Sequence, residues 1–133
     1  MIVRHVDEIK GTEREVTGDT NTWTSRRLLL RKDGMGFSFH ETIIHAGTET
    51  LIWYKNHLEA VYCVGGEGEI EDLSGGKIHP ISDGTMYALN GHEKHYLRAK
   101  TDLRMICVFT PALTGLEDHD ADGVYPLIED ECA

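Results

Sequence analysis

The chain has 133 residues, with 13 Lys and Arg against 23 Asp and Glu, and a formal net charge of −10. This length suits one domain with its own core, and 40% hydrophobic with 27% charged residues is typical of a soluble globular protein. The acidic balance argues against nucleic acid and anionic membranes as partners, because both attract clusters of Lys and Arg. No apolar run approaches the roughly 18 residues of a membrane-spanning helix.

The cysteines and the first residues predict a cytoplasmic protein. Cys63, Cys107 and Cys132 are an odd number without C-x-x-C spacing, which favours free thiols in a reducing compartment over a disulfide framework. Residues 1–8 carry charges where a signal peptide would need a continuous apolar stretch.

The predicted elements are short and separated by glycine-containing turns. Residues 6–11 are expected to form one short helical turn. Strands rich in Ile, Val, Thr, Tyr and Phe are then predicted, in chain order, at 37–44, 50–54, 58–64, 68–73, 77–81, 86–89, 95–99 and 103–110. Strands at this spacing indicate an all-β sandwich or barrel. We expect a single domain over residues 1–128, with one or two short helical turns and an acidic, disordered tail at 129–133.

The last predicted strand, residues 103–110, shows which side chains face inward. Leu103, Met105, Cys107 and Phe109 fall on one face by the alternation of a β-strand. The opposite face is also largely apolar, so we expect this strand to be covered on both sides, by a second sheet or a second copy of the chain.

The chain has eight histidines, a high number for its length, so metal binding has to be considered. His57 and Glu59 are two residues apart, so on a strand they share a face. His92 and His95 are three apart across a predicted turn and need not converge. Taken singly, each has an ordinary explanation: Glu59 could pair with a lysine such as Lys55, and a histidine more often lies at the surface.

The glycine spacing resembles the two conserved motifs of cupin barrels, G-x5-H-x-H-x3-4-E-x6-G and G-x5-P-x-G-x2-H-x3-N. The positions matching the first motif are Gly47, Trp53, Lys55, Glu59 and Gly66. Those matching the second are Gly76, Ser82, Gly84, Tyr87 and Gly91. Three of the usual histidine ligands are therefore replaced, and Tyr87 stands at the ligand position of the second motif. This resemblance implies a single, jelly-roll-like cupin-type β-barrel.

A closer resemblance is to the ectoine synthases, and it runs from residue 1 to about residue 127. It is carried by WYKNHLEAVYC at 53–63, GEGE at 66–69, CVFTP at 107–111 and DGVYP at 122–126. The resemblance implies a homodimeric hydro-lyase that closes a small-molecule substrate, N-γ-acetyl-L-2,4-diaminobutyrate, into ectoine with loss of water.

The same resemblance implies an iron site, with Fe²⁺ held by Glu59, Tyr87 and His95. A carboxylate, a phenolate and one imidazole suit iron better than structural zinc. Candidates for proton transfer are His57, Glu117 and His119. The residues expected to line the substrate pocket are Trp23, Arg27, Thr42, Tyr54, Cys107 and Phe109. For Trp23 and Phe109 a core role, and for Arg27 a surface role, are the ordinary alternatives. Cys107 has no cationic neighbour in sequence, so we interpret it as a packed thiol and not a nucleophile.

Two other functions are compatible with a cupin frame. An iron-dependent oxygenase would consume dioxygen, and an anaerobic assay distinguishes it from a hydro-lyase. A non-catalytic cupin that binds a small osmolyte-like ligand would show saturable binding without turnover.

Overall fold

A computed structural model describes residues 1–115 and residue 118. The predicted domain end at residue 128 and the predicted tail at 129–133 lie outside the described residues. The elements, in chain order, are α1 (Val6–Ile9), β1 (Glu15–Thr17), β2 (Trp23–Leu29), a 3-10 turn (Arg31–Asp33), β3 (Ser38–Ile44), β4 (Glu49–Ile52), β5 (Leu58–Gly65), β6 (Gly68–Asp72), β7 (Lys77–Ile81), β8 (Met86–Leu89), β9 (His95–Ala99) and β10 (Leu103–Thr110).

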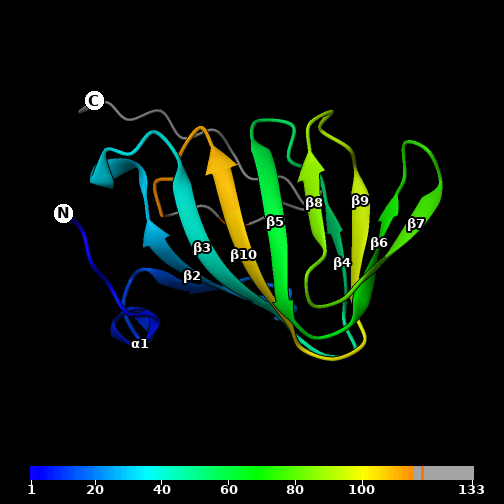
Figure 1. The fold of residues 1–133 in the computed structure, drawn as a ribbon, viewed down its shortest axis with the longest axis horizontal. Coiled ribbons are helices and arrows are strands. Elements are labelled where there is room, and N and C mark those ends of the chain that lie inside the picture. Colours follow the sequence, from blue (N-terminus) through cyan, green and yellow to red (C-terminus); the bar gives the residue numbers. More distant parts are fainter. Residues whose placement is uncertain (116–117, 119–133) are drawn as a thin grey trace.

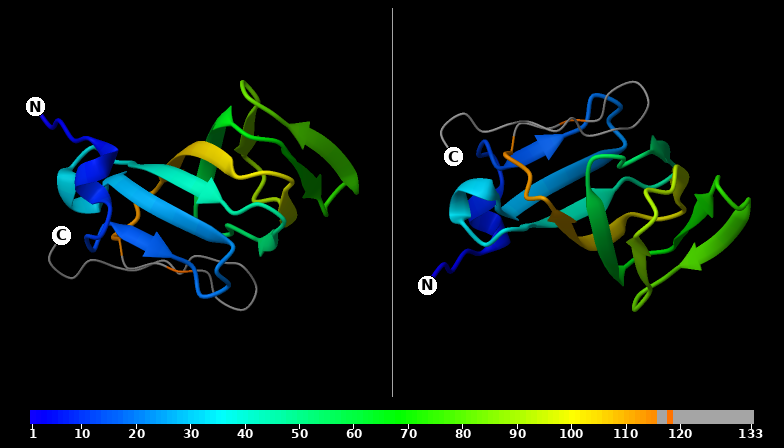
Figure 2. Two further views of the ribbon diagram at one scale, coloured as in Figure 1. Left: turned by 90° about the horizontal axis from the view of Figure 1, so that it is seen from below. Right: turned by 90° about the horizontal axis from the view of Figure 1, so that it is seen from above.

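The strands form two antiparallel sheets (Figures 1 and 2). One has six strands in the order β1-β2-β3-β10-β5-β8, and the other has four in the order β4-β9-β6-β7. This arrangement confirms the cupin-type, all-β prediction and its one or two short helical turns. The two sheets are not joined by strand pairing into a closed barrel among the described residues, so β8 and β7 are both edge strands.

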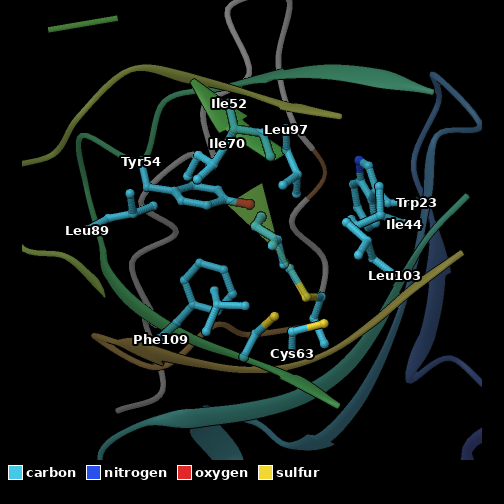
Figure 3. Packing of buried hydrophobic residues seen from close by; sticks show 14 of the residues in the cluster. Trp23, Ile44, Ile52, Tyr54, Cys63, Ile70, Leu89, Leu97, Leu103 and Phe109 are labelled. Atoms are coloured by element: carbon cyan, nitrogen blue, oxygen red, sulfur yellow. The ribbon is translucent and has the colours of Figure 1, made fainter. Parts of the chain in front are cut away.

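The core lies between the inner faces of the two sheets (Figure 3). Alternation along β10 turns Leu103, Met105, Cys107 and Phe109 inward, as the sequence predicts, and each of them is buried. The same alternation along β5 buries Glu59 between hydrophobic neighbours, so a carboxyl group enters the core from a strand that otherwise packs well.

All eight predicted strands are present, with ends within two residues of the expected positions. Strands β1 and β2 were not predicted. The inward residues of β2 are Trp23, Ser25 and Arg27, so two of its three buried positions are polar. A polar residue at a buried position removes the apolar alternation by which a strand is recognised.

In the single chain β10 is covered on its inner face alone, so the expected cover by a second sheet is wrong, while cover by a second copy of the chain stays a prediction. On its outer face Arg104 and Thr110 are exposed, while Ile106 and Val108 are only half-buried. The physical reason is that the four-stranded sheet packs against the inner face of the six-stranded sheet alone.

Helical content among the described residues is confined to α1 and the 3-10 turn. Neither is long and apolar enough to cross a membrane.

Candidate functional site

Three neighbouring strands bring Glu59, Tyr87 and Cys107 to the same inner face. In the β5–β8 ladder Val61 pairs with Tyr87, which makes Tyr87 the diagonal neighbour of Glu59. In the β5–β10 ladder Phe109 pairs with Glu59 and Cys107 with Val61. Residues far apart in sequence therefore converge because the register of three strands fixes them, not because of any local motif.

The Glu59 carboxyl group is buried, with 7% of the residue exposed. Burial raises the pKa of Glu59 from 4.5 to about 8, and a hydrogen bond with the Cys107 thiol opposes that rise. Burial also raises the pKa of Cys107 well above its usual value, with the nearby Glu59 adding to the effect. Cys107 is therefore a protonated, packed thiol, in agreement with the interpretation from its sequence context.

Tyr87 reaches into the same interior from β8. Burial raises the pKa of its phenol well above the ordinary value, and the nearby carboxyl of Glu59 raises it further. The ring centroids of Tyr87 and His95 are 6.5 Å apart, in an edge-on arrangement. Tyr87 thus lies beside both of the other predicted iron ligands.

His95 presents one ring nitrogen with no partner. The residue is 1% exposed, and its Nδ1 is 2.9 Å from the Glu93 carbonyl oxygen, to which it can only donate. Its Nε2 is buried without a hydrogen-bond partner among the described residues. Burial lowers the pKa of His95, so the ring is neutral and Nε2 carries a lone pair. This is the tautomer in which an imidazole binds a metal, with the other nitrogen oriented by a carbonyl.

The chemistry of these donors fits the predicted iron site. Carboxylate, phenolate and a neutral imidazole are ligands that iron accepts, and a bound cation would favour ionisation of Glu59 and Tyr87 against the cost of burial. The described residues contain no cluster of three or more His, Cys, Asp or Glu side chains suited to a metal. A set in which tyrosine is the third ligand is compatible with that finding.

Two cavities meet at Tyr87. The inner one has a volume of about 30 Å³ and is bordered by Glu59 and Tyr87. Five of the six predicted pocket residues also line it, namely Trp23, Thr42, Tyr54, Cys107 and Phe109. The outer one has a volume of about 400 Å³ and is bordered by Tyr87 and His95. The inner volume admits about one or two water molecules, so an open-chain substrate needs its wall to rearrange.

The wall of the inner cavity is aromatic. The rings of Tyr54 and Phe109 meet at 89° with centroids 5.0 Å apart, and Figure 3 shows the Tyr54 hydroxyl reaching toward the middle of the interior. The His57 ring packs edge-on to Phe109 at 6.1 Å, and His57 is buried at the start of β5. His57 and Glu59 therefore both point inward, as their spacing predicts.

Arg27 is fully buried, which excludes the surface role that is the ordinary alternative for an arginine. Its Nε donates to the Ser25 hydroxyl at 3.3 Å, and that hydroxyl lies 3.1 Å from Nδ1 of His40. Arg27 does not line either of the two cavities. It lies instead in a buried polar cluster on β2 and β3, behind the aromatic wall.

His40 was not predicted as a site residue. It is fully buried, its ring centroid is 5.2 Å from that of Phe109, and its Nε2 has no hydrogen-bond partner among the described residues. Burial, with the nearby charge of Arg27, lowers the pKa of His40 well below its ordinary value. The sequence did contain a sign that His40 faces the pocket. Ser38, His40 and Thr42 alternate along one predicted strand and so share a face, and Thr42 was already expected to line the pocket.

Four candidates remain, namely Glu117, His119, Lys55 and His92. Glu117 and His119 lie outside the described residues. Lys55 stacks over the Trp53 ring at 5.0 Å, so it is not placed as a buried partner of Glu59. Nδ1 of His92 lies 2.8 Å from the Tyr54 carbonyl oxygen.

Comparison with known proteins identifies the family. A family model described as ectoine synthase matches residues 1–129. An L-ectoine synthase from Sporosarcina pasteurii is 69% identical over 129 residues, which cover 96% of this chain and 95% of that protein. One from Desulfosudis oleivorans is 66% identical over 131 residues, covering 98% and 100%. The solved ectoine synthase structure from P. lautus is 66% identical with a TM-score of 0.82, covering 86% of this chain and 81% of that chain. The chain belongs to the ectoine synthase family.

Proposed function

We propose that this hydro-lyase closes N-γ-acetyl-L-2,4-diaminobutyrate into ectoine with an iron ion held by Glu59, Tyr87 and His95. The observation that carries the proposal is Nε2 of His95, a buried nitrogen with a lone pair and no partner among the described residues. It lies beside Tyr87, which in turn neighbours Glu59. A neutral imidazole left without a hydrogen bond in a protein interior is costly unless it binds something.

The reaction forms one carbon–nitrogen bond and releases one water molecule. The substrate's α-amine attacks the acetyl carbonyl carbon, the carbon–oxygen bond breaks, and two protons leave with the oxygen to give a cyclic amidine. An amide carbonyl is a poor electrophile, and a bound ferrous ion supplies Lewis acidity to polarise it. Proton transfer needs a base for the attacking ammonium and an acid for the departing oxygen. We assign these two roles among His57, Glu117 and His119.

The rest of the interior would orient the substrate. Trp23, Tyr54 and Phe109 form an aromatic surface against which the substrate chain can fold, so that its amine and amide meet at high effective concentration. The same rings would exclude bulk water from the reacting groups. Thr42 and Cys107 add small polar groups to this wall. Arg27, from its position behind the wall, would supply positive charge toward the substrate carboxylate.

The iron assignment is tested by metal content. Purified protein is reconstituted anaerobically with Fe²⁺, desalted, and its iron is measured by mass spectrometry. We expect about one iron per chain in the wild type, and at least a tenfold lower content in Tyr87→Phe and His95→Ala. Tyr62→Phe is the matched control, because Tyr62 is an exposed tyrosine on the outer face of the neighbouring strand β5. Circular dichroism checks that each variant is folded.

Retention of iron in both variants would contradict the ligand assignment. The same preparation, incubated with the acetylated diaminobutyrate in the absence of dioxygen, should form the cyclic product. Product formation that required dioxygen would favour an oxygenase, and binding without turnover would favour a ligand-binding cupin.

We also propose that two copies of the chain associate through the outer face of β5 and β8. Leu58, Tyr62 and Met86 are 40%, 48% and 61% exposed there, next to the half-buried Ile106 and Val108 of β10. A contiguous apolar face of this kind on a soluble protein marks an interaction site. Light scattering should give the mass of a dimer for the wild type and of a monomer for Tyr62→Glu; a wild-type monomer would refute the proposal.

A cytoplasmic location is part of the same proposal. Cys63 and Cys107 are both buried free thiols, which suits a reducing compartment. Cell fractionation tests it, and recovery of the protein from the culture medium or periplasm would contradict it.

A further inference from the structure

The outer cavity, of about 400 Å³, connects the edge of the fold to the predicted iron ligands. It lies between the two edge strands β7 and β8, where no strand pairing joins the sheets in the part of the chain that the structure describes. His79 and Pro80 line it from β7, and Tyr87 lines it from β8. His95, whose Nε2 lacks a partner, lies on its wall. The inner cavity is not bordered by His95.

Two residues with carboxylates line this cavity near His95. Asp72 pairs with His95 in the β6–β9 ladder, and its Oδ1 accepts a hydrogen bond from the Ser74 amide at 2.8 Å. Glu93 lines the same cavity, and its side chain accepts from the Gly91 amide. Both residues are half-buried, and neither makes an ion pair among the described residues, so no cation of the described chain neutralises the two carboxylates that line this cavity.

The inner cavity offers a cation no comparable approach. Its wall is mostly aromatic and aliphatic, and its one carboxyl group, Glu59, is itself a predicted ligand. A divalent cation carries strongly held water and is drawn to carboxylate oxygen. Apart from the predicted ligands Glu59 and Tyr87, this wall offers only the neutral hydroxyl groups of Thr42 and Tyr54 and no further carboxylate to replace that water.

We propose that the outer cavity between β7 and β8 is the entry route of the iron ion, with Asp72 and Glu93 attracting Fe²⁺ and passing it to His95 and Tyr87. The proposal rests on the iron site proposed above. It assigns Asp72 and Glu93 a role in the rate of metal uptake, distinct from the ligands that hold the metal.

The test compares rates of metal uptake. Metal-free protein is mixed anaerobically with Fe²⁺ in a stopped-flow instrument, uptake is followed by quenching of tryptophan fluorescence, and the final iron content is measured on the desalted protein. The variant is Asp72→Asn/Glu93→Gln, in which each amide keeps the oxygen that accepts the local backbone hydrogen bond. The control is Glu8→Gln/Glu13→Gln, which removes the same charge at exposed positions near β1, the opposite edge strand of the six-stranded sheet.

We expect the cavity variant to take up iron about three- to tenfold more slowly at low ionic strength, with the difference shrinking as salt is added. Its final content should remain one iron per chain, and the control should match the wild type. Equal uptake rates in all three proteins would overturn the route and leave the iron site standing. A cavity variant with little iron at equilibrium would make these carboxylates ligands, which also overturns it. A wild type that binds no iron would refute the proposed site itself.

Discussion

Glu59 gives the metal-free protein a dependence of stability on pH that a single substitution should remove. Its pKa is about 8 in the folded chain because burial disfavours the carboxylate, against 4.5 for an ordinary glutamate. Between these two values the folded protein keeps a proton that the unfolded chain has released. Stability therefore falls as pH rises through this window, by about 1.4 kcal/mol per pH unit.

Over the whole window this loss amounts to about 3–5 kcal/mol, a large share of the free energy of unfolding of a small domain. The Glu59→Gln variant keeps the shape and carries no charge at any pH, so the loss should be absent. Urea unfolding of chelator-treated protein at half-unit steps from pH 5 to 8.5 measures it. The useful quantity is the difference between wild type and variant, because burial also lowers the pKa of His40 and of His95, which adds a pH dependence of its own.

Glu8→Gln is the matched control, since Glu8 is exposed in α1 and should leave the pH dependence unchanged. Parallel curves for wild type and Glu59→Gln would refute the reasoning, because they would mean that the folded protein ionises Glu59 as readily as the unfolded chain does. Added Fe²⁺ should flatten the wild-type curve, since a bound cation lowers the cost of the carboxylate.

Three further substitutions test the fold that supports the site. Asp33→Asn should cost about 3–5 kcal/mol in urea unfolding, because the carboxylate pairs with Arg14 at 3.0 Å and its loss leaves a mostly buried guanidinium short of its partner. The pKa of Asp33 lies well below its usual 3.8, since its hydrogen bonds outweigh the effect of burial, so its stabilisation should be lost as acid takes the pH below about 4. Phe109→Ala should cost about 3–5 kcal/mol by the same assay and increase the binding of small apolar probes; a cost under about 1 kcal/mol would show that the ring is not part of the core. Gly66→Ala should lower the melting temperature, because the residue has φ of +97° and an added Cβ would meet the Asp102 carbonyl; an unchanged melting temperature would contradict this.

The candidate site was predictable where a family motif marks the residue. Glu59, Tyr87 and His95 were expected together, and the structure sets Tyr87 beside each of the other two. His40 and Arg27 were harder, since one was not predicted and the other has a buried position that spacing did not reveal. Nothing local in a sequence says that a histidine or an arginine is 0% exposed, because burial is decided by which strand lies across from it.

By itself the sequence determined the fold class and the eight strands predicted from it. Its length and composition allowed one domain, and its periodicity of two left little choice but an all-β architecture. The family resemblance supplied the expected chemistry. These features depend on local patterns that a chain carries before it folds.

Only the tertiary structure decided where β2 lies, that β7 and β8 are edge strands within residues 1–115, and that the outer cavity between them reaches His95. Strand order and register are set by packing between residues distant in sequence, so periodicity within one segment does not contain them. The composition likewise gives the net negative charge of the chain but not where that charge lies. Folding places two of the acidic residues, Asp72 and Glu93, in the lining of the cavity that borders the proposed iron ligands Tyr87 and His95.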